Sequence, residues 1–242
     1  MPHRYFTDDI TGSYARITGP DAHHLSRVMR AKVGEEVTLC DGKGTDYAAR
    51  ITDVGPEAVM LEVLNAAPSD AEPRLKVTLF VAYPKQDKLE TVIQKGVELG
   101  AVAVQPFVSR FCVAAPKKEE QKLERRRRIA FEAAKQCGRG IVPAVEAPVE
   151  FSALPGLLAG YDRAILLYEK GGVPLRDALA AVPDCGSVAL ITGSEGGFAP
   201  DEAETLKAAG AVVVGLGPRI LRCETAPTAV LAAVMAMTGN LE

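Results

Sequence analysis

The sequence predicts an α/β protein of two domains, a small β-barrel over residues 1–71 and an α/β domain with a mostly parallel sheet over residues 72–242. Apolar side chains alternate along the first third of the chain, which is typical of strands with one buried face. Beyond it, continuous apolar runs are separated by helical stretches, as in a parallel sheet covered on both faces. A polar, proline-bearing connector, Asn65–Leu75, separates the two patterns and marks the boundary.

In the first domain, the alternating pattern predicts three strands: Glu36–Asp41, Asp46–Ile51 and Ala58–Leu64. Turn-forming sequences stand between these strands, as a small barrel requires. A helix is expected from Pro20 to Lys32, because proline suits a first helical turn. Its apolar stripe would consist of Leu25, Val28 and Met29.

In the second domain, five apolar runs predict buried strands: Lys76–Tyr83, Ala101–Val108, Ala164–Glu169, Val188–Gly193 and Ala211–Gly217. Four helices are expected between or after them: Asp87–Leu99, Lys117–Cys137, Pro200–Ala209 and Ala226–Met237. Gly100 follows the first of these helices where a glycine cap is common. The third opens with a proline and two acids, which favours a helix start.

The composition narrows the class of protein. A formal net charge of −3 does not favour nucleic-acid binding, and it leaves room for a local basic face. The five cysteines, including Cys185, form no C-x-x-C pair, which predicts free thiols and a cytoplasmic location. With only three histidines, no metal site is expected. The start of the chain lacks an apolar signal segment, and Ala226–Met237 is too short to cross a membrane.

Residues 190–198, LITGSEGGF, place a glycine-rich turn after a predicted strand. This layout is typical of nucleotide sites in open α/β sheets. The turn is neither G-x-G-x-x-G nor a Walker loop, and the carboxylate of Glu195 would repel a phosphate. A ligand with positive charge and no phosphate would suit it better, and S-adenosylmethionine is such a ligand. The alternative is a tight turn whose glycines supply positive φ, with Glu195 solvated.

A second stretch, residues 215–226 (GLGPRILRCETA), also follows a strand and precedes a helix. Ile220 and Leu221 would wall an apolar pocket, while Arg222 and Glu224 add polar groups. Thr225 is the expected N-cap of the following helix. Because the carboxyl ends of parallel strands meet at one edge of a sheet, both glycine turns are expected to face one crevice.

Together, GSEGGF and GLGPRILRCETA resemble the cofactor-binding signature of the SPOUT methyltransferases, which use S-adenosylmethionine and carry a C-terminal trefoil knot. Within that superfamily the chain resembles the RsmE-type family, which methylates N3 of a uridine in 16S ribosomal RNA. Residues 23–37 are similar to its PUA-like barrel, residues 85–107 to its first helix and strand, and residues 132–139 to its E-A-x-x-Q-x-x-R helix end. The chain differs from the family pattern at Ser194, at Cys223 and over residues 109–112.

The resemblance implies a fold, a partner and a set of site residues. A SPOUT domain with a knot would follow the PUA-like barrel, and the enzyme would be a homodimer acting on 16S ribosomal RNA of the small subunit. The residues expected to bind S-adenosylmethionine come from three loops: Leu167 and Tyr168; Thr192, Gly193, Glu195, Gly196 and Gly197; and Leu216, Gly217, Ile220, Leu221, Arg222, Thr225 and Ala226.

Seven basic side chains are candidates for RNA contact: Arg4, His23, Arg27, Arg30, Lys85, Lys88 and Arg139. His23, Arg27 and Arg30 would share one helical face, a spacing that suits successive phosphates. For Lys85 and Lys88 the alternative is that they are ordinary surface lysines without a contact to RNA. For Arg139 the choice is between reaching the crevice and acting as a cation at a helix C-terminus.

The expected reaction assigns catalytic roles to Arg222 and Glu224. Loss of the N3 proton leaves negative charge on O2 and O4 of uridine, and Arg222 is the candidate to stabilise that anion. Glu224 or Glu195 could assist in removing the proton, and the sequence leaves this choice open. The alternatives are ribose 2′-O methylation, a non-catalytic ribosome-assembly factor that binds RNA, and an enzyme of phosphate-bearing nucleotides.

Overall fold

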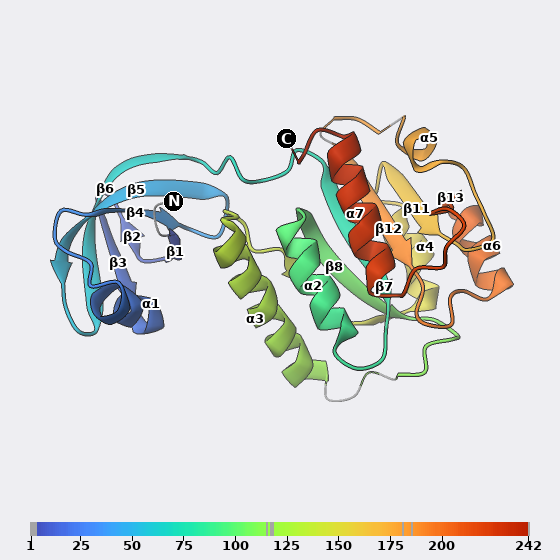
Figure 1. Cartoon of the computed structure of the whole chain (residues 1–242), viewed down its shortest axis with the longest axis horizontal. Helices are drawn as coiled ribbons and strands as arrows, with labels where there is room; N and C mark the ends of the chain where they lie inside the picture. The colour runs from blue at the N-terminus through green and yellow to red at the C-terminus, as the bar shows by residue number, and fades with distance from the viewer. Residues whose placement is uncertain (1–3, 115, 117–118, 181, 185, 242) are drawn as a thin grey trace. The chain divides into compact units, whose positions relative to one another are not determined.

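The computed structural model describes residues 4–114, 116, 119–180, 182–184 and 186–241, and the chain divides into two compact units (Figure 1). Unit 1 consists of Met1–Glu72 together with Ala134–Val142, and unit 2 consists of Pro73–Ala133 with Pro143–Glu242. Lys117, the predicted first residue of the long basic helix, and Cys185 lie outside the described residues.

Unit 1 is built on a six-stranded sheet with the order β1-β4-β5-β6-β3-β2. Its strands are β1 (Arg4–Phe6), β2 (Ile10–Thr11), β3 (Tyr14–Thr18), β4 (Glu36–Cys40), β5 (Thr45–Val54) and β6 (Ala58–Pro68). The alternating residues Leu39, Ile51 and Leu61 are buried in one apolar cluster, which confirms the predicted strands. Since β1 and β2 are the two edges of this sheet, the barrel is an open half-barrel.

Strand β6 is longer than the sequence pattern indicates. Residues 65–68, assigned to the connector from their polar and proline content, pair with residues 45–48 of β5. The remaining connector to β7 is therefore short, from residue 69 to residue 75. Backbone pairing with a long neighbouring strand outweighs the low strand propensity of this segment.

The first helix ends earlier than predicted. Helix α1 (Gly19–His23) passes into a π-helical turn, η1 (His24–Val28). A π turn adds a residue to the helical repeat, so the side chains after Leu25 rotate away from the core. Leu25 is buried, whereas Val28 and Met29 of the predicted stripe are 62% and 38% exposed. The prediction of a stripe through Val28 and Met29 is therefore wrong.

Unit 2 contains a parallel sheet, as the continuous apolar runs predict. Its strands are β7 (Lys76–Ala82), β8 (Ala101–Val108), β9 (Ala144–Val145), β10 (Val149–Glu150), β11 (Arg163–Leu167), β12 (Ser187–Thr192) and β13 (Val212–Val214). The order is β10-β8-β7-β12-β11-β13, with β9 also paired to β8, and each of these pairs is parallel.

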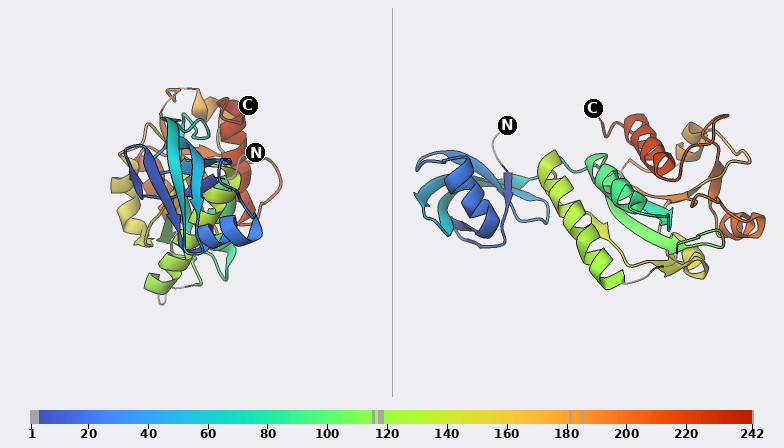
Figure 2. Two further views of the ribbon diagram at one scale, coloured as in Figure 1. Left: turned by 90° about the vertical axis from the view of Figure 1, so that its left-hand side faces the viewer. Right: turned by 60° about the horizontal axis from the view of Figure 1, so that its bottom comes forward.

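Helices cover both faces of this sheet (Figures 1 and 2). They are α2 (Lys88–Glu98), α3 (Glu119–Cys137), η2 (Phe151–Ala153), α4 (Leu154–Leu158), α5 (Leu175–Leu179), α6 (Pro200–Ala208) and α7 (Thr225–Met237). Helices α2 and α7 pack against each other and against the sheet. On the other face, α4 and α6 bury Leu154 and Leu206 in one cluster with Phe80, Leu166 and Ile191.

Helix α7 is a core helix of unit 2. Its Val230, Leu231, Val234 and Met235 are at most 1% exposed. No helix among the described residues has the length and apolar character to span a membrane. The C-terminal knot implied by the resemblance stays a prediction.

Candidate functional site

A pocket of about 600 Å³ lies where the loops after β11, β12 and β13 meet, with Lys88 of α2 in its wall. The carboxyl ends of parallel strands lie at one edge of a sheet, so the loops converge. The sequence analysis expected both glycine turns to face one crevice, and residues of both turns line this pocket. In the structure β11 lies between β12 and β13, and its loop forms the wall between them.

Most residues predicted to bind the cofactor line this pocket. They are Leu167, Tyr168, Thr192, Gly193, Glu195, Gly196, Gly197, Leu216, Gly217, Ile220, Leu221, Arg222 and Ala226. Thr225 does not line it and is not the N-cap either: Glu224 occupies that position without a capping side-chain bond, and Thr225 is the first residue of α7. The sequence analysis missed Glu169 and Gly171, which follow β11 and also line the pocket.

The glycines of the first turn allow a very tight reversal of the chain. The amide of Gly197 donates to the carbonyl of Ser194 at 3.0 Å, and Gly197 has φ of 66°. A Cβ on Gly193 would lie 2.9 Å from the Cα of Gly197, so a side chain at Gly193 would push the two arms apart. The positive φ and this close approach explain why the turn needs glycine at both positions.

Glu195 lines the pocket and has two hydrogen-bond partners from another loop, while 28% of its side chain stays exposed. Its predicted role toward the charge of a ligand stays a prediction. Its Oε1 accepts hydrogen bonds from the backbone N–H of Lys85 at 3.1 Å and from Nζ of Lys88 at 2.9 Å. Burial alone would raise the pKa of Glu195, but the bond from Lys88 and those from backbone amides hold it below its ordinary value. The carboxylate therefore binds the β12 loop to the start of α2.

Lys88 also reaches the loop after β13. Its Nζ lies 3.5 Å from Oε2 of Glu224 and 3.7 Å from Sγ of Cys223. The hydrogen bond to Glu195 raises the pKa of Lys88. Because its ammonium lies between two carboxylates, Lys88 joins the loops after β12 and β13 in the pocket wall. The phosphate contact predicted for Lys88 stays a prediction.

Glu224 and Cys223 form a polar pair beside the pocket. The Cys223 thiol donates to Oε2 of Glu224 at 3.2 Å. Burial first, and then this bond, raise the pKa of Cys223 to about 12, which favours the protonated thiol and a packing role. Glu224 does not line the pocket. Although burial would raise its pKa, bonds from backbone, Cys223 and Lys88 lower it, which makes Glu224 a weak base.

Arg222 lines the pocket and has an exposed side chain. Its backbone carbonyl accepts hydrogen bonds from the amides of Thr225 and Ala226, each at 2.9 Å. The backbone carbonyl of Arg222 therefore supports the start of helix α7. The guanidinium group takes no part in these bonds. The structural and the proposed catalytic roles of Arg222 can be separated by a side-chain substitution.

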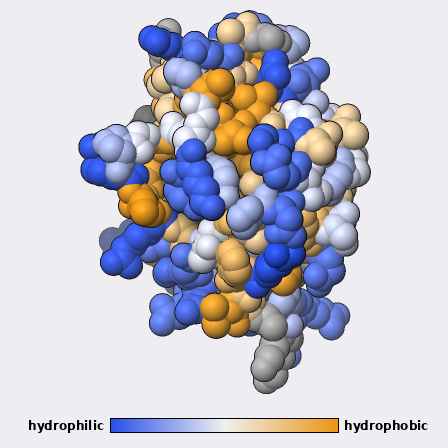
Figure 3. Space-filling model, turned by 90° about the vertical axis from the view of Figure 1, so that its right-hand side faces the viewer, coloured by the Kyte–Doolittle hydropathy of each residue, from blue (hydrophilic) through white to orange (hydrophobic). Residues whose placement is uncertain are grey.

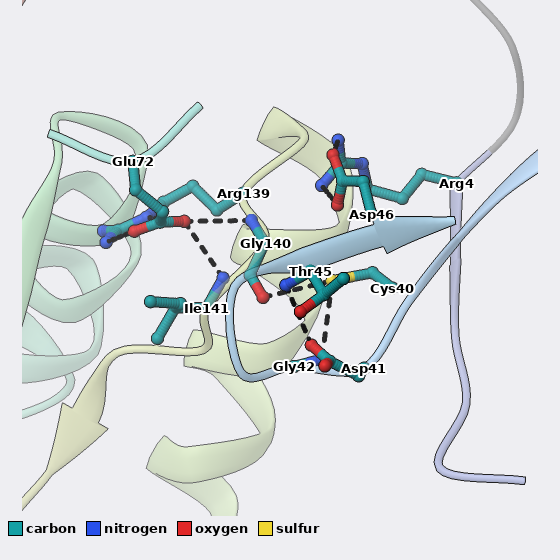
Figure 4. Close-up of polar contacts among 10 residues, drawn as sticks. All are labelled: Arg4, Cys40, Asp41, Gly42, Thr45, Asp46, Glu72, Arg139, Gly140 and Ile141. Atoms are coloured by element: carbon teal, nitrogen blue, oxygen red, sulfur yellow. Dashed lines mark hydrogen bonds and ion pairs between the residues drawn. The ribbon is translucent and has the colours of Figure 1, made fainter. Parts of the chain in front are cut away.

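Two of the predicted RNA contacts are engaged inside unit 1 (Figure 4). Arg4 forms a bidentate pair with Asp46, at 3.0 and 2.5 Å. The Arg139 side chain is 4% exposed and pairs with Glu72 at 2.6 Å. Arg139 belongs to unit 1, where its guanidinium is engaged by Glu72, and its predicted reach to the crevice stays a prediction.

The Glu72 carboxylate also accepts hydrogen bonds from the amides of Gly140 and Ile141, at 2.9 and 3.0 Å (Figure 4). Burial alone would raise the pKa of Glu72. The bonds from Arg139 and from the two amides instead hold it below its ordinary value. Glu72 thereby fixes the segment after α3 to the end of unit 1.

The predicted basic face of the first helix is only partly present. His23 and Arg27 are exposed, four residues apart. Arg30 lies beyond the end of η1 with φ of 53°, so it does not share a helical face with them. Lys85 is exposed. Helix α3 contains four consecutive arginines, Arg125–Arg128. Of these, Arg126 is buried, and its NH2 donates to the Tyr83 hydroxyl at 2.7 Å.

Among the described residues, no group of three or more histidine, cysteine or acidic side chains is placed to hold a metal ion. Figure 3 shows one face of the molecule, with hydrophobic side chains gathered in its upper half and hydrophilic ones around them. Ile220, on the loop after β13, is 87% exposed.

Comparisons with known proteins agree with this arrangement. Residues 71–235 match a family model described as an RNA methyltransferase domain, and residues 17–64 match an RNA methyltransferase PUA domain. The chain is 36% identical over 232 residues to ribosomal RNA small subunit methyltransferase E of Bacillus subtilis, covering 93% of this chain and 91% of that protein. The Synechocystis protein of the same name is 34% identical, with 95% and 75% covered.

Among solved structures, the chain resembles a ribosomal RNA small subunit methyltransferase E from Neisseria gonorrhoeae bound to S-adenosyl methionine. The TM-score is 0.83 with 30% identity, and the match covers 98% of each chain. The two-domain architecture predicted from the sequence, a PUA-like domain before a parallel α/β domain, is confirmed by these matches.

Proposed function

This chain belongs to the RNA methyltransferase family, and we propose that it transfers a methyl group from S-adenosylmethionine to N3 of a uridine in 16S ribosomal RNA of the small subunit. The observation that carries the proposal is the pocket of about 600 Å³ formed by the loops after β11, β12 and β13. Its volume is within the range of small-molecule sites.

The pocket residues suit this cofactor. Leu167, Leu216 and Leu221 offer apolar surface to an adenosine, and the glycine turn exposes backbone polar groups. The carboxylate of Glu169 lies 3.5 Å from the position that a Cβ of Gly197 would occupy, and it offers an acceptor to an amino group. The ammonium of Lys88 is already neutralised by Glu195 and Glu224, so it adds no free charge for a phosphate.

S-adenosylmethionine supplies the methyl group on a sulfonium that leaves as a neutral thioether. The protein's own contribution is to orient the uridine and to stabilise the charge that develops on it. We propose that Arg222, which lines the pocket, donates to O2 or O4 as N3 loses its proton. Since Glu195 and Glu224 have lowered pKa values, we propose that the proton leaves to water instead of to either carboxylate.

The decisive experiment uses small ribosomal subunits from a strain that lacks the protein. Incubation with the purified enzyme and S-adenosylmethionine should produce 3-methyluridine at one position, measured by nucleoside mass spectrometry. A 2′-O-methylated nucleoside, or no product, would contradict the assignment. Calorimetry should detect S-adenosylmethionine and S-adenosylhomocysteine binding, with no binding of ATP or NAD.

The remaining parts of the proposal concern assembly and division of labour. We propose a cytoplasmic homodimer, in which residues 1–71 hold the RNA and residues 72–242 carry out the transfer. The side chain of Ile220, which lines the pocket and is 87% exposed, supports a second copy near the site. Light scattering should give twice the monomer mass of 25.6 kDa, and a monomer mass at every working concentration would contradict the dimer.

A further inference from the structure

The turn between β7 and α2, residues 83–87, lies directly beside the pocket. It follows Val81, which pairs with Thr192 of the pocket wall, and it precedes Lys88. We call residues 83–87 the lysine turn. Its Lys85 and Gln86 are exposed, and Lys85 does not line the pocket.

The start of the lysine turn is fixed by buried contacts. Tyr83 is 4% exposed, and its amide donates to the carbonyl of Phe107 at 2.7 Å. Its hydroxyl donates to Glu119 at 2.6 Å and accepts from Arg126 at 2.7 Å. The backbone therefore enters the turn from a rigid base.

The middle of the turn is held by Glu195 alone among the contacts described for it. Gln86 adopts φ of 58°, a conformation that a side chain other than glycine disfavours and that persists where the surroundings fix it. The Glu195 carboxylate accepts hydrogen bonds from the amide of Lys85 and from the ammonium of Lys88, which lie on either side of Gln86. One carboxylate thus holds both flanks of the strained residue.

This arrangement leaves the Lys85 ammonium facing solvent at the edge of the site. Within the described ranges, no ion pair engages it, in contrast to Lys88. A flexible point charge next to a pocket that acts on one nucleotide suits contact with the adjoining phosphate of the RNA chain.

We propose that Glu195 is a positioning residue: it holds the lysine turn in its strained form, so that Lys85 contacts an RNA phosphate beside the target nucleotide. The inference rests on the proposed RNA methylation and adds a role for the carboxylate in the glycine turn. Glu195 would then link the cofactor loop to RNA binding instead of contacting the cofactor's charge itself.

The test measures binding of 16S ribosomal RNA at several salt concentrations, using the full chain. Each phosphate contact contributes about 0.7–0.9 to the slope of log affinity against log salt. Lys85→Ala should reduce the slope by that amount and weaken RNA binding several-fold, with S-adenosylhomocysteine affinity within about twofold of the parent. Lys76→Ala is the matched control, because Lys76 is an exposed lysine at the opposite end of β7.

The role of Glu195 is tested by a double-mutant cycle. Glu195→Ala should reduce the slope of log affinity against log salt by the same amount as Lys85→Ala. The double variant should show no further reduction. Glu195→Gln keeps an acceptor for the Lys85 amide and should recover most of the RNA affinity. A Lys85→Ala variant that matches Lys76→Ala, or additive losses in the cycle, would overturn the inference. Failure of the unaltered enzyme to methylate the subunit would instead refute the proposed function.

Discussion

Substitution of Arg222 by alanine tests the proposed chemistry most directly. The uridine ring is neutral before N3 loses its proton, so a donor to O2 or O4 acts mainly in the transition state. Removal of one such donor lowers the rate on the order of 10²–10³, about 2.7–4 kcal/mol in activation free energy. Arg222→Lys keeps the charge and loses the planar fork, so it should recover only part of the rate.

The structure predicts that this substitution costs little stability. The side chain of Arg222 is exposed, and the bonds that start α7 come from its backbone carbonyl to the amides of Thr225 and Ala226. Alanine keeps that carbonyl. We expect the free energy of unfolding to change by no more than about 0.5 kcal/mol, as for other surface substitutions, and S-adenosylhomocysteine affinity to stay within about twofold.

The assay combines single-turnover methylation of small subunits with calorimetric titration of S-adenosylhomocysteine on the same variant. Arg176→Ala is the matched control, because Arg176 is an exposed arginine of α5 that does not line the pocket. The rate deficit of Arg222→Ala should shrink as pH rises, since N3 then ionises without help. Equal losses of cofactor affinity and rate, or a normal rate, would refute the reasoning.

Three further predictions concern buried side chains. Glu72→Gln should lower the free energy of unfolding of unit 1 by about 3 kcal/mol, because Arg139 is buried against this carboxylate. Urea unfolding followed by circular dichroism measures this change, since the chain has no tryptophan. The difference in unfolding free energy between parent and variant should have its full size above the ordinary carboxyl pKa. It should disappear as pH falls through the lowered pKa of Glu72, and a difference that does not change with pH would contradict the ion pair. Cys40 and Cys223, whose pKa values burial raises to about 11 and 12, should be alkylated at pH 8 more slowly than the less buried Cys137, as measured by peptide mass mapping; equal rates would count against the buried thiols.

The sequence by itself determined the two-domain architecture, the parallel sheet and the location of the pocket at its carboxyl edge. Each of these follows from local repeats: alternation in Glu36–Cys40, continuous apolar runs such as Ala101–Val108, and glycine turns directly after strands. Such patterns report which faces of an element are buried, and they need no knowledge of distant partners.

Predictions from local sequence patterns were wrong where an extra residue changes the helical repeat, or where a neighbouring strand offers backbone partners. The apolar spacing through Val28 and Met29 assumed a regular α-helix, and the π turn over His24–Val28 removed both from the core. Residues 65–68 have the composition of a connector and became strand, because β5 offered them partners. Neither event leaves a periodic trace in the sequence.

Only the tertiary structure decided the partners of charged side chains. Glu195 meets Lys85 and Lys88, more than a hundred residues earlier in the chain, because β12 lies beside β7 in the sheet. Glu72 likewise meets Arg139, which lies 67 residues later in the chain. A sequence lists the charges of a protein, but the energy of each charge depends on burial and on the nearest opposite charge, and both are set by how the strands and helices pack.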